Sequence, residues 1–186
     1  MISVNDLRNG MTIEIDNNIF QILEFQHVKS ARSAAFVRLK VKNLRTGTVN
    51  ELTVNPNEKY NQAVIEKVSM QYLYNTGDTY VFMNNSTFEQ LEIPASDLEH
   101  EKNFIREGME VTIVMYHSEI LGIDLPDKVT LEIVECEPAV AGNTATSAMK
   151  QAVLETGLAV QVPLFIENGE KIVVSTEDGK YVSRAR

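Results

Sequence analysis

The sequence predicts an all-β protein built from several small β-barrels. Short runs of β-branched and aromatic residues recur along its 186 residues, and turn-forming clusters of Asn, Asp, Gly and Pro separate them at intervals typical of small barrels. Two runs near the N-terminus alternate apolar and polar residues, which is the pattern of strands with one buried face. Helix signals are strong in only one segment, so we expect little helix.

The longest predicted element is a β-hairpin made of residues 19–28 and 35–42. Both segments are rich in β-branched and aromatic residues, and a short loop joins them. Successive side chains of a strand point to opposite faces. In the second segment the predicted core face carries Val37, Leu39 and Val41, and the predicted cationic face carries Arg38, Lys40 and Lys42.

The one predicted helix spans residues 94–104. A serine at position 96 can cap its first turn, and a glutamate follows three residues later, as in a capping box. Leu98, Phe104 and Ile105 supply part of an apolar stripe. We therefore expect a short amphipathic helix here.

Charge and turn signals predict three domains, which are residues 1–63, 64–128 and 129–186. A polar, turn-rich stretch ends the first domain, and a proline turn at residues 125–128 precedes a new strand at 129–134. The net charges of the three domains are +2, −8 and −3. Domains of about sixty residues have marginal cores on their own, so we expect packing between them to add stability.

Positive charge is concentrated in one stretch of the first domain, although the whole chain has a net charge of −9. No acidic residue occurs between Glu24 and Glu51. The cations there are Lys29, Arg32, Arg38, Lys40, Lys42 and Arg45. Such a local field suits a nucleic-acid backbone, which the acidic middle domain would repel. We therefore predict local contact with RNA or DNA.

Several other functions lack support in the sequence. The chain has one cysteine and three widely separated histidines, so we expect no disulfide, metal or cofactor. Signatures of nucleophilic or phosphate-loop enzymes are absent. The sequence has neither an apolar run of membrane-spanning length nor a signal-like N-terminus, so we expect a cytoplasmic protein without membrane contact.

Long segments in all three predicted domains carry a family resemblance. They are MISVNDLRNGMTIEIDNNIFQILEFQHVK, AFVRLKVKNLRTG, MQYLY, YVFMNN, GIDLPDKVTLEIVECEP, KQAVLETGLAVQVPLFIENGEKIVV and DGKYVSRA. On these residues the chain resembles bacterial elongation factor P over its whole length. The resemblance implies an SH3-like (KOW-like) N-terminal barrel and two OB-fold barrels, in an L-shaped arrangement similar to a tRNA.

The resemblance also implies a function. Such a protein would be a monomeric, non-enzymatic translation elongation factor that binds the ribosome beside the peptidyl-tRNA and relieves stalling at consecutive prolines. Its partners would be the ribosome, peptidyl-tRNA, ribosomal RNA and a modifying enzyme. The cationic residues expected to contact the RNA backbone are Arg38, Lys40, Lys42 and Arg45.

The hairpin tip departs from the usual family pattern. That pattern resembles K-P-G-K-G, with an enzymatically extended lysine, and a minority branch has K-S-G-R-N, with a rhamnosylated arginine. The loop here, which we expect to contact peptidyl-tRNA, reads Lys29, Ser30, Ala31, Arg32 and Ser33. Three alternatives stay open: rhamnosylation of Arg32, an unmodified Arg32, or modification of Lys29. We favour Arg32 as the acting group.

The tip also lacks glycine, which changes the expected loop conformation. Residues other than glycine are strained at positive φ, so we expect a type I or helix-like turn. In such a turn the hydroxyl of Ser30 or Ser33 can accept hydrogen bonds from loop amides.

A second departure lies in the third domain. The family usually has a G-D-T loop near the messenger RNA, and this chain has Gly142, Asn143 and Thr144. The two departures leave a specialised paralogue open as an alternative. A general single-stranded RNA- or DNA-binding OB protein is another.

Overall fold

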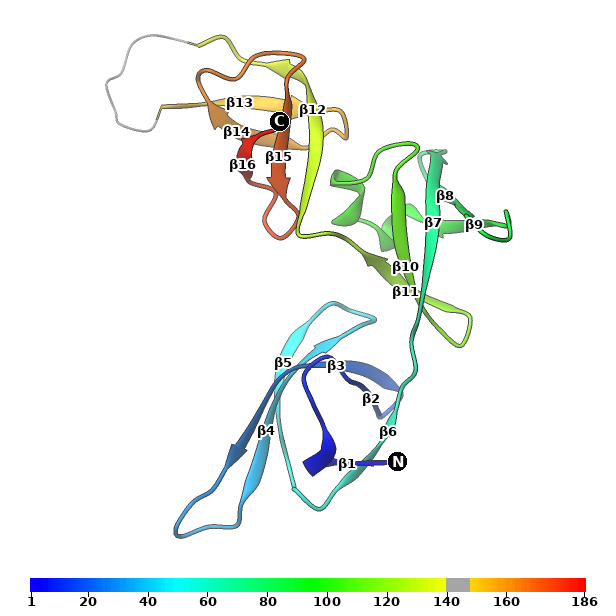
Figure 1. Cartoon of the computed structure of the whole chain (residues 1–186), viewed down its shortest axis with the longest axis vertical. Helices are drawn as coiled ribbons and strands as arrows, with labels where there is room; N and C mark the ends of the chain where they lie inside the picture. The colour runs from blue at the N-terminus through cyan, green and yellow to red at the C-terminus, as the bar shows by residue number, and fades with distance from the viewer. Residues whose placement is uncertain (140–147) are drawn as a thin grey trace. The chain divides into compact units, whose positions relative to one another are not determined.

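The computed structural model describes residues 1–139 and 148–186, which form three β-sheets (Figure 1). The described residues contain no helix longer than a three-residue 3-10 turn. The predicted all-β class is therefore confirmed. Within the same residues, no helix is long and apolar enough to cross a membrane.

The chain divides into two compact units. One unit contains residues 1–67 and 114–122, and the other contains residues 68–113 and 123–186. The first sheet lies in the first unit and the third sheet in the second. The boundaries expected after residues 63 and 128 stay a prediction.

The first sheet has six strands. They are β1 (Ile2–Ser3), β2 (Thr12–Ile15), β3 (Asn18–Val28), β4 (Phe36–Asn43), β5 (Val49–Val54) and β6 (Lys59–Gln62), and a 3-10 turn (Val4–Asp6) follows β1. Their order across the sheet is β1-β6-β2-β3-β4-β5. The two strands of the predicted hairpin are confirmed as β3 and β4, with bounds within one residue of those expected.

Alternation along β4 separates core from solvent as predicted. Val37, Leu39 and Val41 are fully buried, whereas the three cations between and after them are exposed. The buried side chains share a cluster with the apolar residues Val4, Leu7, Ile13, Phe20, Ile22 and Val54. A one-residue slip of this strand would turn three cations into the core, so burial fixes its register strongly.

The second sheet has five strands. They are β7 (Glu66–Asn75), β8 (Thr79–Asn84), β9 (Gln90–Pro94), β10 (Glu110–Tyr116) and β11 (Glu119–Asp124). Their order is β11-β10-β7-β8-β9. Three of these strands each contribute a buried side chain: Tyr72 on β7, Phe82 on β8 and Ile93 on β9.

The predicted helix over residues 94–104 is wrong. The segment forms two 3-10 turns, Ala95–Asp97 and Glu101–Asn103, separated at Leu98, which has φ −121° and ψ 30°. Tertiary contacts explain this outcome. Phe104 is buried in the core of the third sheet, and the His100 ring nitrogen lies 2.7 Å from the Thr176 carbonyl oxygen. These contacts fix the backbone of residues 95–104 in a conformation that a single continuous helix does not have.

The third sheet also has five strands. They are β12 (Lys128–Cys136), β13 (Met149–Leu154), β14 (Ala159–Pro163), β15 (Lys171–Ser175) and β16 (Tyr181–Arg184). Their order is β14-β13-β12-β15-β16. The central strand β12 pairs with β15 along its first part and with β13 after a bulge near Ile133, so the sheet curls around one core.

Candidate functional site

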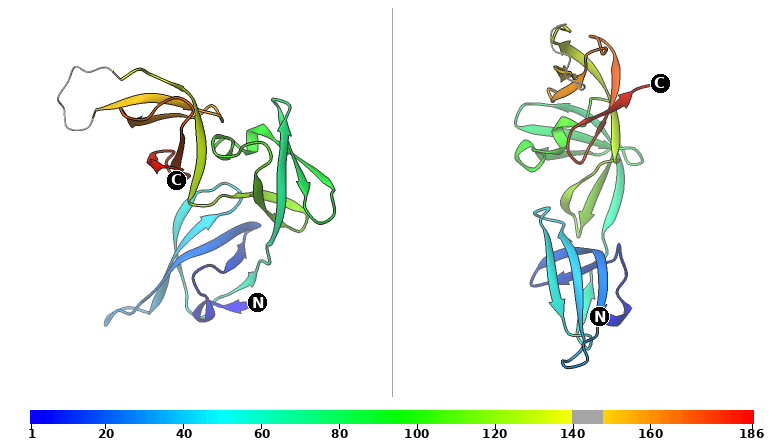
Figure 2. Two further views of the ribbon diagram at one scale, coloured as in Figure 1. Left: turned by 45° about the horizontal axis from the view of Figure 1, so that its top comes forward. Right: turned by 90° about the vertical axis from the view of Figure 1, so that its left-hand side faces the viewer.

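The β3–β4 hairpin forms an arm that extends beyond β2, which pairs with β3 only from Asn18 to Gln21, and its tip projects from the first sheet in both views of Figure 2. Its two strands remain paired as far as Val28 and Phe36. Strand β5 adds a third strand along the arm, because β4 pairs with β5 from Lys42 to Val37. The ladder of hydrogen bonds on both sides of β4 makes the arm stiff almost to its tip.

The tip loop joins Val28 to Phe36, and the predicted contact residues within it are all exposed. The backbone N–H of Arg32 donates a hydrogen bond to the Ser30 hydroxyl oxygen at 3.4 Å. None of the residues from 29 to 35 has a positive φ. The absence of positive φ agrees with a loop that needs no glycine, and the Ser30 hydroxyl accepts from a loop amide as expected. The type I or helix-like form of the turn stays a prediction.

Arg32 lies in the middle of this loop with its side chain in solvent. Within the described residues, its guanidinium has no hydrogen-bond or ion-pair partner. A guanidinium presents five N–H donors in a planar fork, which matches phosphate oxygens and can stack on bases. The loop therefore presents an unused anion-binding group at the end of a stiff arm.

The three cations of β4 differ in their electrostatic surroundings. Arg38 faces Gln26 on β3 and Thr53 on β5, so its cross-strand neighbours are uncharged. Lys42 faces Gln21 and Val49, which are also uncharged.

Lys40, by contrast, lies between two carboxylates. Its cross-strand neighbours are Glu24 on β3 and Glu51 on β5. Directly opposed side chains on one sheet face have Cβ atoms about 4.5 to 5.5 Å apart, so these charges oppose the field of the lysine. In the sequence these two glutamates only mark the ends of a stretch without acidic residues. Their position beside Lys40 depends on the strand register, which the sequence pattern did not predict.

Arg45 is engaged within the protein. Its Nε donates to Glu119 Oε1 at 3.0 Å and its Nη2 donates to Glu119 Oε2 at 2.9 Å, a two-point contact. Its Nη1 also donates to the Asn17 carbonyl oxygen. The hydrogen bond to Glu119 raises the pKa of Arg45 above its usual value. RNA contact by Arg45 stays a prediction, and it would compete with these bonds.

The partners of Arg45 come from two tight turns. Asp16 and Asn17 have φ of 50° and 64°, and His117 and Ser118 have φ of 46° and 66°, in the turns between β2 and β3 and between β10 and β11. Short hairpin turns favour this left-handed geometry. Seventy-four residues separate Arg45 from Glu119, so no local sequence signal could have indicated their pairing.

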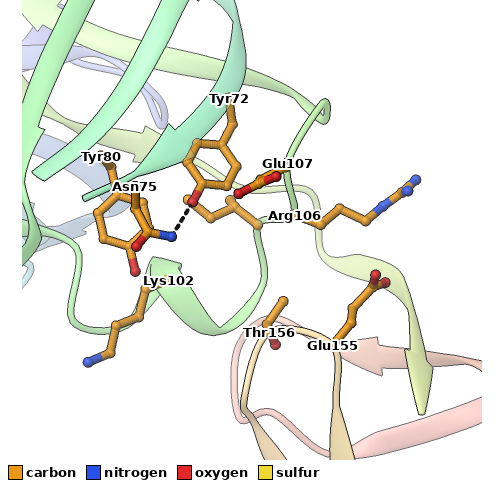
Figure 3. A pocket seen from close by; sticks show the side chains of 9 residues that line it. Tyr72, Asn75, Tyr80, Lys102, Arg106, Glu107, Glu155 and Thr156 are labelled. Atoms are coloured by element: carbon orange, nitrogen blue, oxygen red, sulfur yellow. Dashed lines mark hydrogen bonds between the residues drawn. The ribbon is translucent and has the colours of Figure 1, made fainter. Parts of the chain in front are cut away.

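A polar pocket lies in the second unit, between the second and third sheets (Figure 3). It has a volume of about 350 Å³ and is lined in part by Tyr72, Asn75 and Tyr80. Asn75 Nδ2 donates to the Tyr72 hydroxyl at 2.8 Å. Burial raises the pKa of Tyr72, while the Asn75 hydrogen bond opposes that rise. The sequence pattern did not predict this pocket.

The other predicted contact loop belongs to the third predicted domain. Gly142, Asn143 and Thr144 lie outside the described residues. Their contact with messenger RNA stays a prediction that rests on the sequence.

Three family models match the chain in succession. The model described as the elongation factor P KOW-like domain matches residues 3–60. The elongation factor P OB domain matches residues 65–123, and the elongation factor P C-terminal model matches residues 129–184. The three matches belong to one family and leave few residues unmatched.

Two solved structures resemble this one. The first is titled eukaryotic translation initiation factor 5A from Methanococcus jannaschii; it is 20% identical, covers 66% of this chain and 92% of its own, and has a TM-score of 0.51. The second is titled translation initiation factor eIF-5A family protein from Naegleria fowleri, with 14% identity, coverage of 67% and 96%, and a TM-score of 0.45. The family models and the first of these structures confirm the predicted all-β fold with a KOW-like N-terminal domain, and the two domains predicted as OB-fold barrels are curled half-barrels.

Proposed function

Because the chain belongs to the elongation factor P family of non-enzymatic translation factors, which act on the ribosome, we propose that it stimulates peptide-bond formation at consecutive prolines through Arg32. In this proposal the protein binds beside the peptidyl-tRNA, and the β3–β4 arm carries Arg32 to the aminoacylated end of that tRNA. The protein contributes order and charge, and the ribosome performs the reaction.

The physical basis of the proposal is the geometry of the reacting groups. Proline is a constrained and poor nucleophile in peptide-bond formation, so a badly placed peptidyl end reacts slowly with it. Holding that end in a reactive position removes an entropic cost that can amount to several kcal/mol, on the order of 7 to 11 in favourable intramolecular cases. A stiff probe suits this task better than a flexible loop.

The observation that carries the proposal is the position of Arg32. It is exposed at the end of an arm that three strands support, and its own side chain makes no intramolecular bond among the described residues. Arg38 and Lys42 face solvent farther along the same arm, between uncharged neighbours. Cations in such positions can contact phosphates and fix the register of the arm without reading sequence.

The direct test replaces Arg32 and measures synthesis across a polyproline stretch in a purified translation system. Arg32→Ala is expected to lose most of the stimulation of polyproline synthesis, since it removes all the N–H donors of the guanidinium. Arg32→Lys is expected to retain part of it, because it keeps the charge but not the planar fork. Arg106→Ala serves as the matched control, since Arg106 is also an exposed arginine but lies in the acidic middle segment. Equal stimulation by Arg32→Ala and wild type would remove Arg32 from the mechanism.

We also propose Arg32 as a site of rhamnosylation. The support is the similarity of the tip to the K-S-G-R-N pattern, which shares Ser30 and Arg32, together with the exposure of the loop. Intact-mass measurement of protein from its native host is expected to show one added deoxyhexose, which Arg32→Ala abolishes and Lys29→Ala leaves in place. The opposite result would assign the modification to Lys29, and an unshifted mass would leave Arg32 as an unmodified acting group.

The glycine-free tip also favours a second candidate function. A specialised member of the family would act on a subset of stalling sequences, since a shorter, unextended group reaches less far than an extended lysine. A panel of stalling reporters separates the two candidates. General relief of all polyproline reporters supports the first, and relief of only a subset supports the second.

A further inference from the structure

Phe88, in the turn between β8 and β9, combines two unusual properties. Its side chain is 71% exposed, and its backbone has a φ of +61°. The other non-glycine residues with positive φ in the described parts of the chain are Asp16, Asn17, His117 and Ser118. Those four are polar and lie in pairs in tight hairpin turns, whereas Phe88 is a bulky apolar residue for which this conformation is an outlier.

The turn around Phe88 is fixed by many hydrogen bonds. The N–H of Phe88 donates to the Asn84 carbonyl oxygen at 2.9 Å, and the Asn84 side-chain oxygen accepts from the N–H groups of Ser86 and Thr87 at 2.8 and 3.2 Å. Asn85 Nδ2 donates to the Ser69 hydroxyl on β7 at 3.1 Å. The turn therefore holds the phenylalanine in a strained conformation that glycine or asparagine would adopt more easily.

Folding does not explain this choice of residue. An exposed phenyl ring gains little from burial within the chain, and the left-handed backbone costs stability. Strain of this kind persists at sites where a side chain must be presented in one direction. The ring is thus a candidate anchor for a partner.

Charge indicates the class of that partner. Residues 66–101, which contain the turn and the strand β7 that it bonds to, have seven aspartates and glutamates and one lysine, Lys67. A surface that binds nucleic acid needs several cations to neutralise phosphates, and this segment is strongly acidic. A protein surface rich in lysine and arginine is complementary to the same charges.

We infer that the β8–β9 turn is a docking site for a basic protein surface, with Phe88 as the apolar anchor that fills a pocket on the partner. The inference rests on the proposed function only in that the ribosome supplies the partner. It adds a contact that is independent of the Arg32 arm and belongs to the other compact unit. Aromatic anchors in water-excluding pockets commonly contribute a large share of the binding energy of an interface.

The first arm of the test measures ribosome binding of Phe88→Asn, with Ser86→Ala as the matched control in the same turn. Asparagine tolerates the left-handed backbone, so the variant is expected to fold and to melt roughly 2 to 4 °C above wild type. Its affinity for ribosomes is expected to fall about tenfold or more, as for loss of an interface anchor. Ser86→Ala is expected to bind like wild type. A variant that is both more stable and weaker in binding separates docking from folding.

The second arm identifies the contact. A photo-crosslinking phenylalanine analogue at position 88 keeps the aromatic ring, and the variant is irradiated on purified ribosomes. A crosslink to a protein, at a peptide rich in lysine and arginine, supports the inference. A crosslink to ribosomal RNA, no crosslink, or wild-type affinity of Phe88→Asn overturns it.

Polyproline synthesis is measured in parallel so that the two proposals can fail separately. Lost ribosome affinity in Phe88→Asn, together with a crosslink to a basic protein, upholds the docking site whatever the polyproline assay gives. If wild type then gives no stimulation of polyproline synthesis, that outcome overturns only the proposed function. Normal stimulation with a crosslink to RNA would overturn only the docking site.

Discussion

Lys40 and its two neighbours show at the residue scale how strand register alters a cationic face. The stretch from residue 25 to 50 has no acidic residue, yet Glu24 and Glu51 from its two ends both face Lys40. Among the cations of the arm, Lys40 therefore has two acidic cross-strand neighbours, whereas Lys29, Arg32, Arg38 and Lys42 have none. Arg45, bound to Glu119, contributes least to a free cationic surface.

The first prediction at this scale concerns Lys40. Glu51→Gln is expected to strengthen ribosome binding, since it leaves Lys40 less neutralised, by roughly two- to fivefold, as for one exposed charge pair. Lys40→Ala is expected to weaken binding less than Arg38→Ala. Affinity is measured at low and high salt, where screening should shrink both effects. Equal losses in the two alanine variants would show that Glu24 and Glu51 do not reduce the contribution of Lys40.

The second residue-scale prediction concerns Tyr60 and pH. Burial raises the pKa of Tyr60 to about 12, and the hydrogen bond to Glu58 acts in the same direction. The unfolded chain loses this proton near pH 10. Between about pH 10 and 12 the folded state therefore holds a proton that the unfolded state has lost, so the free energy of unfolding falls as pH rises.

Tyr60→Phe removes this contribution. Urea unfolding is measured at pH 8 and at several pH values above 10. Above pH 10 the free energy of unfolding is expected to fall less steeply with pH in the variant than in wild type. Below pH 9 the two proteins are expected to show the same pH dependence. Parallel curves for the two proteins above pH 10 would contradict the assignment.

At the scale of elements, the 3-10 turns at residues 95–103 show what local signals leave out. A serine cap and an apolar stripe favour one helix. The segment, however, lies between the second and third sheets and makes contacts with both. Thr156 donates its hydroxyl to the Asn103 carbonyl oxygen at 2.7 Å, and Phe104 is 2% exposed in the third-sheet core. Burial of a large aromatic side chain outweighs a helix propensity of a few tenths of a kcal/mol per residue.

The element-scale prediction follows from that burial. Phe104→Ala is expected to lower the free energy of unfolding by about 3 to 5 kcal/mol, because it leaves a cavity in the third-sheet core. Phe165→Ala is the control, since Phe165 is 60% exposed, and it is expected to cost far less. Chemical unfolding followed by circular dichroism measures both. A loss below about 1 kcal/mol in Phe104→Ala would mean that the segment is not part of this core.

At the scale of the whole molecule, the separation of charge restricts where RNA can bind. The first 63 residues carry a net charge of +2, and the remainder carries −11. An OB-type surface that binds single-stranded nucleic acid combines a cationic groove with aromatic side chains that stack on the bases. The two later segments are acidic and therefore do not favour such a groove. We therefore expect contact with RNA to depend on the arm and on the ribosome that presents its target.

The prediction at this scale concerns naked nucleic acid. Single-stranded RNA in solution is expected to bind weakly. The slope of log affinity against log salt for ribosomes is expected to stay near roughly −3 to −4, since Lys29, Arg32, Arg38 and Lys42 are free arm cations and each contributes roughly −0.7 to −0.9. Gel-shift and sedimentation assays over a salt series measure the two quantities. Tight, steeply salt-dependent binding of naked oligonucleotides would instead favour the general single-stranded binder.

The sequence by itself determined the all-β class, the β3–β4 hairpin and the exposed Arg32 loop. These features follow from local rules, since alternation along a strand assigns faces and turn residues assign loops. The tertiary structure alone decided the pairing of Arg45 with Glu119, the two glutamates beside Lys40 and the 3-10 path before Phe104. Each of these depends on residues distant in sequence, and a strand pattern does not encode which distant residue becomes a neighbour. The strain at Phe88 likewise became visible only in the folded turn, because φ is a property of conformation and not of composition.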